Sequence, residues 1–209
     1  MKVIGLTGGS GSGKSTAMAV LAEMGAHTID CDAVYHGLLE AGDPMLDEIE
    51  RRFLGMVVVD GRLDRKALGK IVFNDPAALR DLSAITHSHV CRAADERLAD
   101  LALYSPPPEG CPPGRAAFLV AIEAIALIES GLNQRCDFVV AVLAPIEDRV
   151  RRITARDGIA PDYAKARIES QKPDEFFHAR CDYILENTCP SQEAFAERCR
   201  EFFGRILRD

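Results

Sequence analysis

Near the start of the chain, eight residues follow the pattern G-x-x-x-x-G-K-[S/T]: they are GGSGSGKS, from Gly8 to Ser15. An apolar run over residues 2–6 precedes them and predicts a short buried strand. A helical pattern follows over residues 15–24, and Gly25 is placed to end that helix. A strand, a glycine-rich loop and a helix, in this order, are the setting of a phosphate-binding loop. The alternative, a glycine-rich turn without a ligand, leaves the lysine and both flanks unexplained.

The chemistry of this loop is specific. Glycines let backbone N–H groups converge on phosphate oxygens, and the N-terminus of a helix adds partial positive charge. Lys14 would reach the β- and γ-phosphates, and the Ser15 hydroxyl would bind Mg²⁺. The motif therefore predicts a nucleoside triphosphate site without specifying the reaction. The loop residues expected to contact the nucleotide are Gly9, Gly11, Ser12, Gly13, Lys14, Ser15 and Thr16.

Composition bounds the class of protein. The 209 residues suit one domain carrying inserted pieces, and 47% of them are hydrophobic, enough for a substantial core. The net charge of −7 argues against a general nucleic-acid or membrane-surface binder, which would be basic. We expect no membrane span and no signal or transit peptide. The seven cysteines are scattered without a C-x-x-C pair, so we expect reduced thiols and a cytoplasmic location.

Strand-like apolar runs alternate with helical patterns along the chain. Strands are predicted at residues 2–6, 27–30, 117–122, 138–143 and 182–186. Helices are predicted at residues 15–24, 44–54, 64–72, 76–102, 124–134, 146–156, 161–171 and 191–207. Asp75-Pro76 is a good start for the long helix, which we expect to break near His87. Short, nearly continuous apolar strands are typical of a parallel sheet covered by helices on both faces.

The fold class that follows is α/β, with a five-stranded parallel sheet of the P-loop NTPase type flanked by helices. We expect a single domain, 1–209, whose core covers about 1–34, 115–147 and 179–209. Two helical insertions interrupt this core. The first, about 35–103, contains the turn Asp60-Gly61, and the second, about 148–178, is dense in charge. The Pro-rich segment 106–114 predicts an exposed connector.

Two carboxylates, Asp30 and Asp32, follow the second predicted strand. In an open parallel sheet, ligands bind outside the carboxyl ends of the strands. If the second strand neighbours the first, a carboxylate here can face the γ-phosphate and accept a proton from an attacking hydroxyl. The alternative is a pair of ordinary loop carboxylates, one of which caps the next helix. Spacing alone favours neither interpretation.

Two further features fit phosphoryl transfer. The third predicted strand runs into Glu123, a Walker-B-like ending whose carboxylate would act on Mg²⁺ directly or through water. Arg149, Arg152 and Arg156 are spaced three and four residues apart, so they share one face of a helix. A lid carrying such arginines would stabilise the transferring group and exclude water. The alternative is a solvated helix face paired with nearby acids.

Taken together, these residues resemble the dephospho-coenzyme A kinase family over most of the chain. The phosphate loop is shared by many families, but the order and spacing of the other segments are much more specific. The matching segments are Ile4 to Thr16, Ile29 to Val34, Asp60 to Leu68 with Val72-Phe73, Ile85 to His87, Glu129 to Leu132, R-x-x-x-R-D-G from Arg152 to Gly158, Arg167-Ile168-x-x-Gln171, and Cys181 to Asn187.

The resemblance implies that ATP phosphorylates the ribose 3′-hydroxyl of dephospho-coenzyme A, the last step of coenzyme A biosynthesis. It places the general base at Asp32, which favours the functional interpretation of that carboxylate. It places the acceptor side in the helical insertion about 35–103, where Arg65 and His87 match family positions. Arg152 and Arg156 take the arginine positions of the lid, about 148–178. Asn187 matches the loop near the adenine of ATP.

These assignments make Lys14, Asp32 and Arg152 the expected catalytic residues, with Ser15 and Glu123 at the expected Mg²⁺ site. The expected partners are ATP and dephospho-coenzyme A, with no nucleic acid and no membrane, and the expected state is a monomer or weak homo-oligomer. The rival functions are another small-molecule P-loop kinase and a nucleotide switch or regulatory ATPase. The N-K-x-D motif of a guanine-specific switch does not occur in the sequence.

The chain departs from the family pattern at three places. Cys31 replaces the middle residue of Asp-Ala-Asp, and Ser88 replaces the proline of His-Pro. Glu123 is one methylene longer than the usual aspartate, and Ile125 stands where the family has proline. These changes leave Lys14, Ser15, Asp32 and Arg152 in place.

Overall fold

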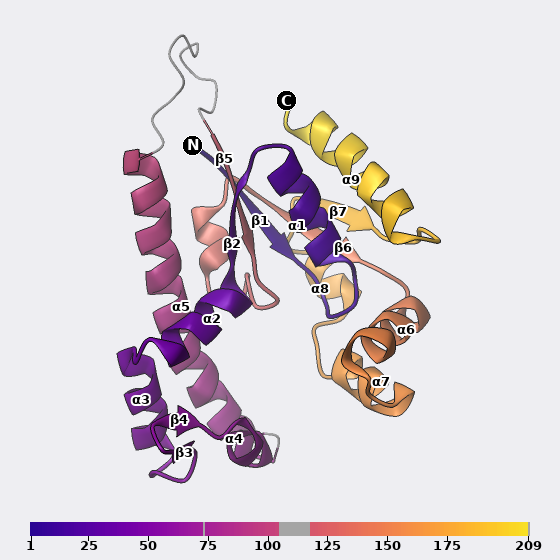
Figure 1. Ribbon diagram of the computed structural model, residues 1–209. Coiled ribbons are helices and arrows are strands. Elements are labelled where there is room, and N and C mark those ends of the chain that lie inside the picture. The colour runs from indigo at the N-terminus through magenta and orange to yellow at the C-terminus, as the bar shows by residue number, and fades with distance from the viewer. Residues whose placement is uncertain (73, 105–117, 209) are drawn as a thin grey trace. The chain divides into compact units, whose positions relative to one another are not determined.

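The structure is a computed structural model that describes residues 1–72, 74–104 and 118–208 (Figure 1). The Pro-rich segment 106–114, for which we predicted a connector, lies outside the described residues. The chain divides into two compact units. The first consists of Met1–Ile29 and Ser105–Asp209, and the second of Asp30–Tyr104. The insertion predicted at about 35–103 lies within the second unit.

A five-stranded sheet forms the centre of the first unit. Its strands are β1 (Lys2–Thr7), β2 (His27–Asp30), β5 (Leu119–Glu123), β6 (Phe138–Leu143) and β7 (Tyr183–Glu186). Their order in the sheet is β2-β5-β1-β6-β7, and β1 pairs in parallel with both β5 and β6. The predicted fold class is confirmed. The condition that the second strand neighbours the first is not met, because β5 lies between β2 and β1.

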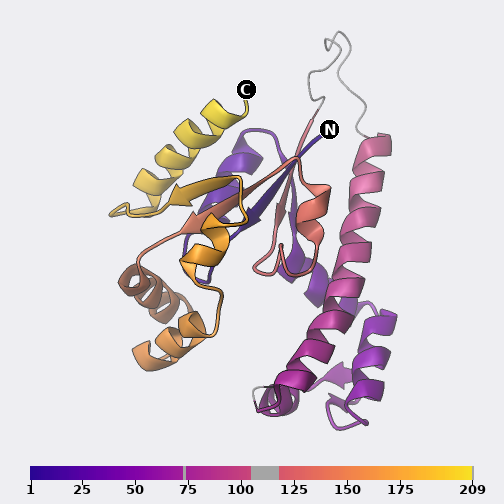
Figure 2. The ribbon, with the colours of Figure 1, turned by 180° about the vertical axis from the view of Figure 1, so that it is seen from behind.

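Alternation along β6 shows how the sheet buries both of its faces. Val140 and Val142 belong to one core cluster with side chains of α1 (Lys14–Glu23) and α9 (Gln192–Ile206). Ala141 and Leu143, which point to the opposite face, pack with α8 (Asp174–His178). Figures 1 and 2 show these helices on opposite sides of the sheet. Burial on both faces explains why the strand has no polar position within it.

Helix α1 ends as Gly25 predicts. This glycine has φ 93°, its N–H donates to the Ala22 carbonyl, and the Ala26 N–H reaches back to Leu21. These two bonds form a Schellman motif, which needs the left-handed conformation that glycine adopts without strain.

The prediction of a helix at 124–134 is wrong. Consecutive turns follow β5 instead, and they lead into the short 3₁₀ helix η1 (Leu132–Arg135). Gly131 has φ 80° just before η1, a left-handed conformation that no α-helix can continue through. The other helices of this unit are α6 (Ile146–Asp157) and α7 (Pro161–Glu169). Together with α8, which the sequence analysis did not predict, they cover the predicted lid.

The second unit is built on one long helix, α5 (Pro76–Tyr104). Against it pack α2 (Cys31–Glu40), α3 (Pro44–Arg52) and α4 (Arg65–Val72), of which α2 was not predicted. The predicted break near His87 is wrong. After Pro76 the helix contains neither glycine nor proline, so nothing interrupts its backbone hydrogen bonds.

A small hairpin joins α3 to α4. Strand β3 (Val58–Val59) pairs antiparallel with β4 (Arg62–Leu63) across the predicted turn Asp60-Gly61. Both turn residues have positive φ, 50° and 71°, as a two-residue hairpin of this type requires.

Asp43 connects α3 to α5. Its carboxylate caps α3 by accepting from the Met45 N–H at 2.9 Å, and Arg92 on α5 donates to it at 2.6 Å. Nδ1 of His89, also on α5, lies 2.6 Å from the same carboxylate, while Nε2 lies 3.3 Å from Glu48. Burial raises the pKa of Asp43, but the hydrogen bonds from Met45, Arg92 and His89 outweigh it and hold the pKa below its usual value.

We therefore expect Asp43→Ala to lower the free energy of unfolding by about 2 kcal/mol, because it removes a helix cap and takes the carboxylate away from the buried His89. Urea denaturation measures the loss, with Asp47→Ala, an exposed acid on the same helix, as the control. Because the folded pKa is lowered, this stabilisation is present above about pH 3.9 and disappears as the pH falls through the folded pKa. An equal loss in both variants would contradict this role.

Candidate active site

The phosphate loop runs from β1 into α1, and its glycines are required by close contacts. Gly8, Gly11 and Gly13 have φ of 132°, 75° and 111°, all in the region that favours glycine. A Cβ at Gly8 would collide with the carbonyl oxygen of Val142. A Cβ at Gly9 would occupy the place of the Arg149 guanidinium. The loop is therefore enclosed by residues from the second half of the chain.

Donors from outside the loop bind its carbonyl oxygens. Arg149 Nε donates to the Ser10 carbonyl at 2.9 Å, and Arg152 Nη1 donates to the Gly11 carbonyl at 3.1 Å. The Ser12 carbonyl accepts from Arg152 Nη1 at 3.3 Å. The same carbonyl accepts from Asn187 Nδ2 at 2.8 Å, and the Asn187 Oδ1 accepts from Arg152 in turn.

These bonds determine where the loop presents its N–H groups. In a trans peptide the C=O and the following N–H point in opposite directions. Holding the Ser10 carbonyl on Arg149 thus directs the Gly11 N–H the other way. Holding the Ser12 carbonyl on Arg152 and Asn187 does the same for the N–H of Gly13. Together with the positive end of α1, these N–H groups make an anion site.

Lys14 is a buried cation within this loop, with only 6% of its surface exposed. Its ammonium donates to the Gly9 carbonyl at 3.2 Å and lies 3.9 Å from the Glu123 carboxylate. Glu123 reaches it because β5 is next to β1 in the sheet, with Leu6 paired to Glu123. The strand order thus brings Glu123, the Walker-B-like end of the third predicted strand, next to the phosphate loop.

Ser15 and Glu123 suit a magnesium ion by the chemistry of their donors. The Ser15 side chain is exposed in the first turn of α1, and Glu123 ends the neighbouring strand. A hydroxyl and one carboxylate are hard oxygen donors, and Mg²⁺ typically takes few protein ligands, keeping waters and substrate phosphates for the rest. Thr16, the last predicted loop residue, donates its N–H to the Gly13 carbonyl at 3.0 Å.

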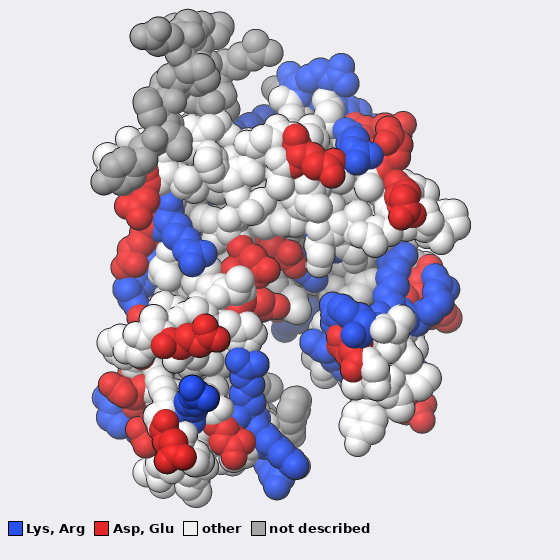
Figure 3. All heavy atoms as spheres, viewed as in Figure 1, with Lys and Arg blue, Asp and Glu red and all other residues white. Residues whose placement is uncertain are grey.

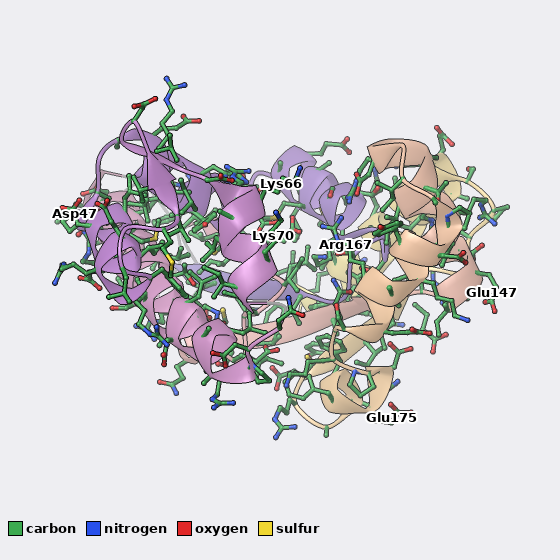
Figure 4. The ribbon with its side chains drawn as sticks, turned by 90° about the horizontal axis from the view of Figure 1, so that it is seen from below. Asp47, Lys66, Lys70, Glu147, Arg167 and Glu175 are labelled. Carbon is green, nitrogen blue, oxygen red and sulfur yellow. The ribbon has the colours of Figure 1, made fainter. Side chains whose placement is uncertain are left out.

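Lys and Arg side chains gather over the region of α6 and α7 (Figure 3). The three arginines predicted to share one face of α6, Arg149, Arg152 and Arg156, separate into two groups. Arg149 and Arg152 contact the loop, whereas Arg156 is exposed and pairs with Asp157, its Nε lying 2.6 Å from Oδ1. Arg167 on α7, labelled in Figure 4, pairs with the same carboxylate at 2.9 Å. In this structure Arg156 is paired as the alternative of a solvated helix face describes, and its contact with the nucleotide stays a prediction.

Two residues that contact the loop were not among the predicted site residues. Arg149 was considered only with the other arginines of the lid, and Gln171 only as part of a matching segment. Arg149 is 5% exposed, and burial lowers the pKa of its guanidinium, against the opposing charge of Asp174. Gln171 accepts from the Ser10 N–H at 2.9 Å and donates to the Ser10 hydroxyl at 2.8 Å.

The predicted acceptor-side residues all lie in the second unit. Asp30 caps α2, accepting from the N–H groups of Asp32 and Ala33 at 2.9 and 3.1 Å. The carboxylate of Asp32 is exposed in the first turn of that helix, so one acid is structural and the other is left accessible. His87 is half-buried on α5.

Arg65 opens α4 and binds α2. Its Nη2 lies 2.9 Å from Nδ1 of His36, and both residues line a hollow of about 540 Å³ together with Arg62. Lys66 and Lys70 extend the basic character of α4 one turn apart (Figure 4). Glu40 and Asp60 line the same hollow, so basic and acidic groups lie side by side in it.

With this geometry in place, comparison with known proteins is informative. The family model described as dephospho-CoA kinase matches residues 2–193. The chain belongs to the dephospho-CoA kinase family. The resemblance inferred from the sequence motifs is thereby confirmed, and with it the kinase class of the enzyme.

Individual relatives agree with the family model. A dephospho-CoA kinase of Anaeromyxobacter dehalogenans is 43% identical, covering 100% of this chain and 92% of the relative. Among solved structures, TT1252 from Thermus thermophilus has a TM-score of 0.77 at 36% identity, covering 99% of this chain and 97% of its own. Dephospho-CoA kinase from Campylobacter jejuni has a TM-score of 0.64 at 27% identity, covering 100% and 98%.

None of the helices that the structure describes combines the length and the apolar character needed to cross a membrane.

We expect Lys14→Ala to reduce turnover about 100-fold or more, the usual cost of removing one donor that stabilises transition-state charge. Lys165→Ala, an exposed lysine paired with Glu169 on α7, is the matched control. The measurement is the rate of ADP release, with thermal unfolding to show that both variants fold. Near-normal turnover of a folded Lys14→Ala variant would remove Lys14 from the mechanism.

Proposed function

We propose that this chain transfers the γ-phosphoryl group of ATP to the ribose 3′-hydroxyl of dephospho-coenzyme A, with the phosphate loop as the nucleotide site and Asp32 as the general base. Members of the family to which it belongs carry out the ATP-dependent phosphorylation of dephospho-coenzyme A, the last step of coenzyme A biosynthesis. The observation that carries the assignment is the full-length family match on a chain whose phosphate loop is complete.

The loop holds the triphosphate. N–H groups of Gly11, Ser12 and Gly13 bind the β-phosphate, and Lys14 neutralises charge between the β- and γ-phosphates. Lys14 is suited to this because its ammonium is buried and held by the Gly9 carbonyl within the loop. A donor fixed before the substrate arrives does not need to reorganise during the reaction.

Ser15 and Glu123 are the proposed magnesium residues. When bound there, Mg²⁺ would neutralise phosphate charge. The Ser15 hydroxyl and the Glu123 carboxylate supply the hard oxygens that this ion prefers. Glu123 also balances the charge of Lys14 in the structure described here, at 3.9 Å.

Asp32 is the proposed general base. Since Asp30 uses its carboxylate to cap α2, the neighbouring Asp32 keeps its own exposed for a substrate hydroxyl. Arg65 and His87 are proposed to bind the acceptor, and the hydrogen bond between Arg65 and His36 orients the guanidinium. A fixed, planar guanidinium suits phosphate oxygens.

Arg152 and Asn187 are proposed to act at the nucleotide. Both hold the Ser12 carbonyl, so their side chains are already placed beside the loop. In the proposed reaction Arg152 stabilises the transferring group, and Asn187 lies by the adenine. Arg156 remains a proposed ligand only if it leaves Asp157 when nucleotide binds.

The cellular setting is also a proposal. Cys31, Cys91, Cys136, Cys181, Cys189 and Cys199 are free thiols in the described residues, which supports action in the cytoplasm. The proposed oligomeric state is a monomer or weak homo-oligomer.

The deciding assay measures ADP release from ATP and Mg²⁺ with and without dephospho-coenzyme A, together with the mass of the product. Strong stimulation by the acceptor and a mass increase of one phosphoryl group are expected. ADP release that does not depend on the acceptor would instead indicate an ATPase or nucleotide switch. Phosphorylation of other acceptors only would indicate a different small-molecule kinase.

We expect Asp32→Asn to reduce turnover by about 100-fold or more, since general-base catalysis contributes on that scale. Asp30→Asn is the matched control, because asparagine caps a helix about as well as aspartate and leaves the neighbouring carboxylate intact. Both variants are assayed for acceptor-dependent ADP release. Equal activities would show that Asp32 is not the base.

A further inference from the structure

The backbone N–H, the hydroxyl and the carbonyl of Ser10 are all hydrogen-bonded to side chains from outside the loop. Its N–H donates to Gln171 Oε1 at 2.9 Å, its hydroxyl accepts from Gln171 Nε2 at 2.8 Å, and its carbonyl accepts from Arg149 Nε at 2.9 Å. Gln171 and Arg149 also contact one another, with Arg149 Nη2 donating to Gln171 Oε1 at 2.8 Å. The three residues form a closed ring of hydrogen bonds, which we call the Ser10 clamp.

The clamp lies in buried surroundings. Ser10 and Arg149 are each 5% exposed, and Gln171 is partly buried. Within the described residues, no carboxylate lies at ion-pair distance from Arg149, so its charge is satisfied by the Ser10 carbonyl and the Gln171 amide. A buried guanidinium in such a position is costly unless its hydrogen bonds are made, which favours one fixed geometry.

The two side chains that hold Ser10 lie on or just after helices that pack against each other. Arg149 is on α6, and Gln171 follows the end of α7. Ile153 of α6 packs with Ala164 and Ile168 of α7 in one small apolar cluster. Figures 1 and 2 both show the two helices side by side. The position of the clamp therefore depends on how α6 and α7 pack.

We propose that Gln171 and Arg149 are positioning residues for the nucleotide, which fix the Ser10–Gly11 peptide so that the Gly11 N–H faces the phosphate site. This inference rests on the proposed use of the loop for ATP. Neither side chain needs to touch the substrate, because both act through the loop backbone. Nucleotide affinity then depends on the α6–α7 pair as well as on the loop sequence.

A glutamine is suited to position 171 because one carboxamide both accepts and donates. Its oxygen receives the Ser10 N–H and the Arg149 Nη2, while its nitrogen serves the Ser10 hydroxyl. Glutamate keeps the two acceptor contacts, and the serine hydroxyl can turn to become the donor. Alanine removes all of these contacts at once.

The test is calorimetric titration with ADP, which reports on the nucleotide site without turnover. Gln171→Ala is expected to weaken ADP binding about 10-fold, the scale of losing hydrogen bonds that include a charged donor. Gln171→Glu is expected to recover affinity to within about 3-fold of the parent. Gln134→Ala, an exposed glutamine of η1, is the control and should bind as the parent does.

Steady-state kinetics separate positioning from a general structural effect. In Gln171→Ala the KM for ATP is expected to rise about 10-fold, with the KM for dephospho-coenzyme A changed less than about 2-fold. Unchanged ADP affinity, or an equal rise in both KM values, would overturn the proposal. If the parent does not phosphorylate dephospho-coenzyme A, the proposed function fails, while the ADP titrations still test the clamp.

Ser10→Ala provides a second test that does not depend on the folding of Gln171→Ala. It removes only the hydroxyl contact and is expected to weaken ADP binding about 2- to 3-fold. Adding it to Gln171→Ala is expected to cause no further loss, because the contact is already gone. Additive losses in the double variant would overturn the clamp.

Discussion

A peptide unit cannot point its carbonyl and its N–H in the same direction, and the nucleotide site of this chain depends on that constraint. The N–H groups of Gly11 and Gly13 point to one side because the carbonyls of Ser10 and Ser12 are held on the other. The groups that hold them are Arg149, Arg152 and Asn187, which come from the second half of the chain. The sheet makes this possible, since β6 and β7 follow β1 in order and carry these residues to the loop.

In the second unit, hydrogen bonds to acidic side chains fix where the helices begin. Its helices begin at acids that cap them, including Asp30 at α2, Asp43 at α3 and Asp64 at α4, so each start is fixed by a local hydrogen bond. At α2 the two neighbouring acids differ in their surroundings. The Asp30 carboxylate is occupied by capping the helix, whereas Asp32 is exposed in its first turn. The structural interpretation therefore describes Asp30, and the general-base role of Asp32 stays a proposal.

Sequence patterns predicted all five strands of the large sheet, four of them from apolar runs and β2 from its place between two helical patterns. They could not predict strand order, which depends on contacts between distant segments, and so the neighbour of β2 stayed a condition of the argument. Helix α2 was missed since Val34, Tyr35 and Gly37 lower its local helical preference, which Asp30 and the core overcome. Spacing placed three arginines on one face of α6 but could not show that Asp157, next in the chain, would bind Arg156. Gln171 belongs to a matching segment, but the pattern does not indicate its contact with Ser10, which forms only when the end of α7 meets the loop.

The conformation of the loop at Gly9 depends on a second residue, Arg149, far along the chain. The missing side chain of Gly9 is the space in which the guanidinium of Arg149 lies, so the glycine and the arginine are two halves of one contact. A side chain introduced at residue 9 would expel Arg149, and a bulkier residue at 149 would press on the backbone there. A side chain at residue 9 therefore requires a smaller residue at position 149, although the two positions are 140 residues apart along the chain.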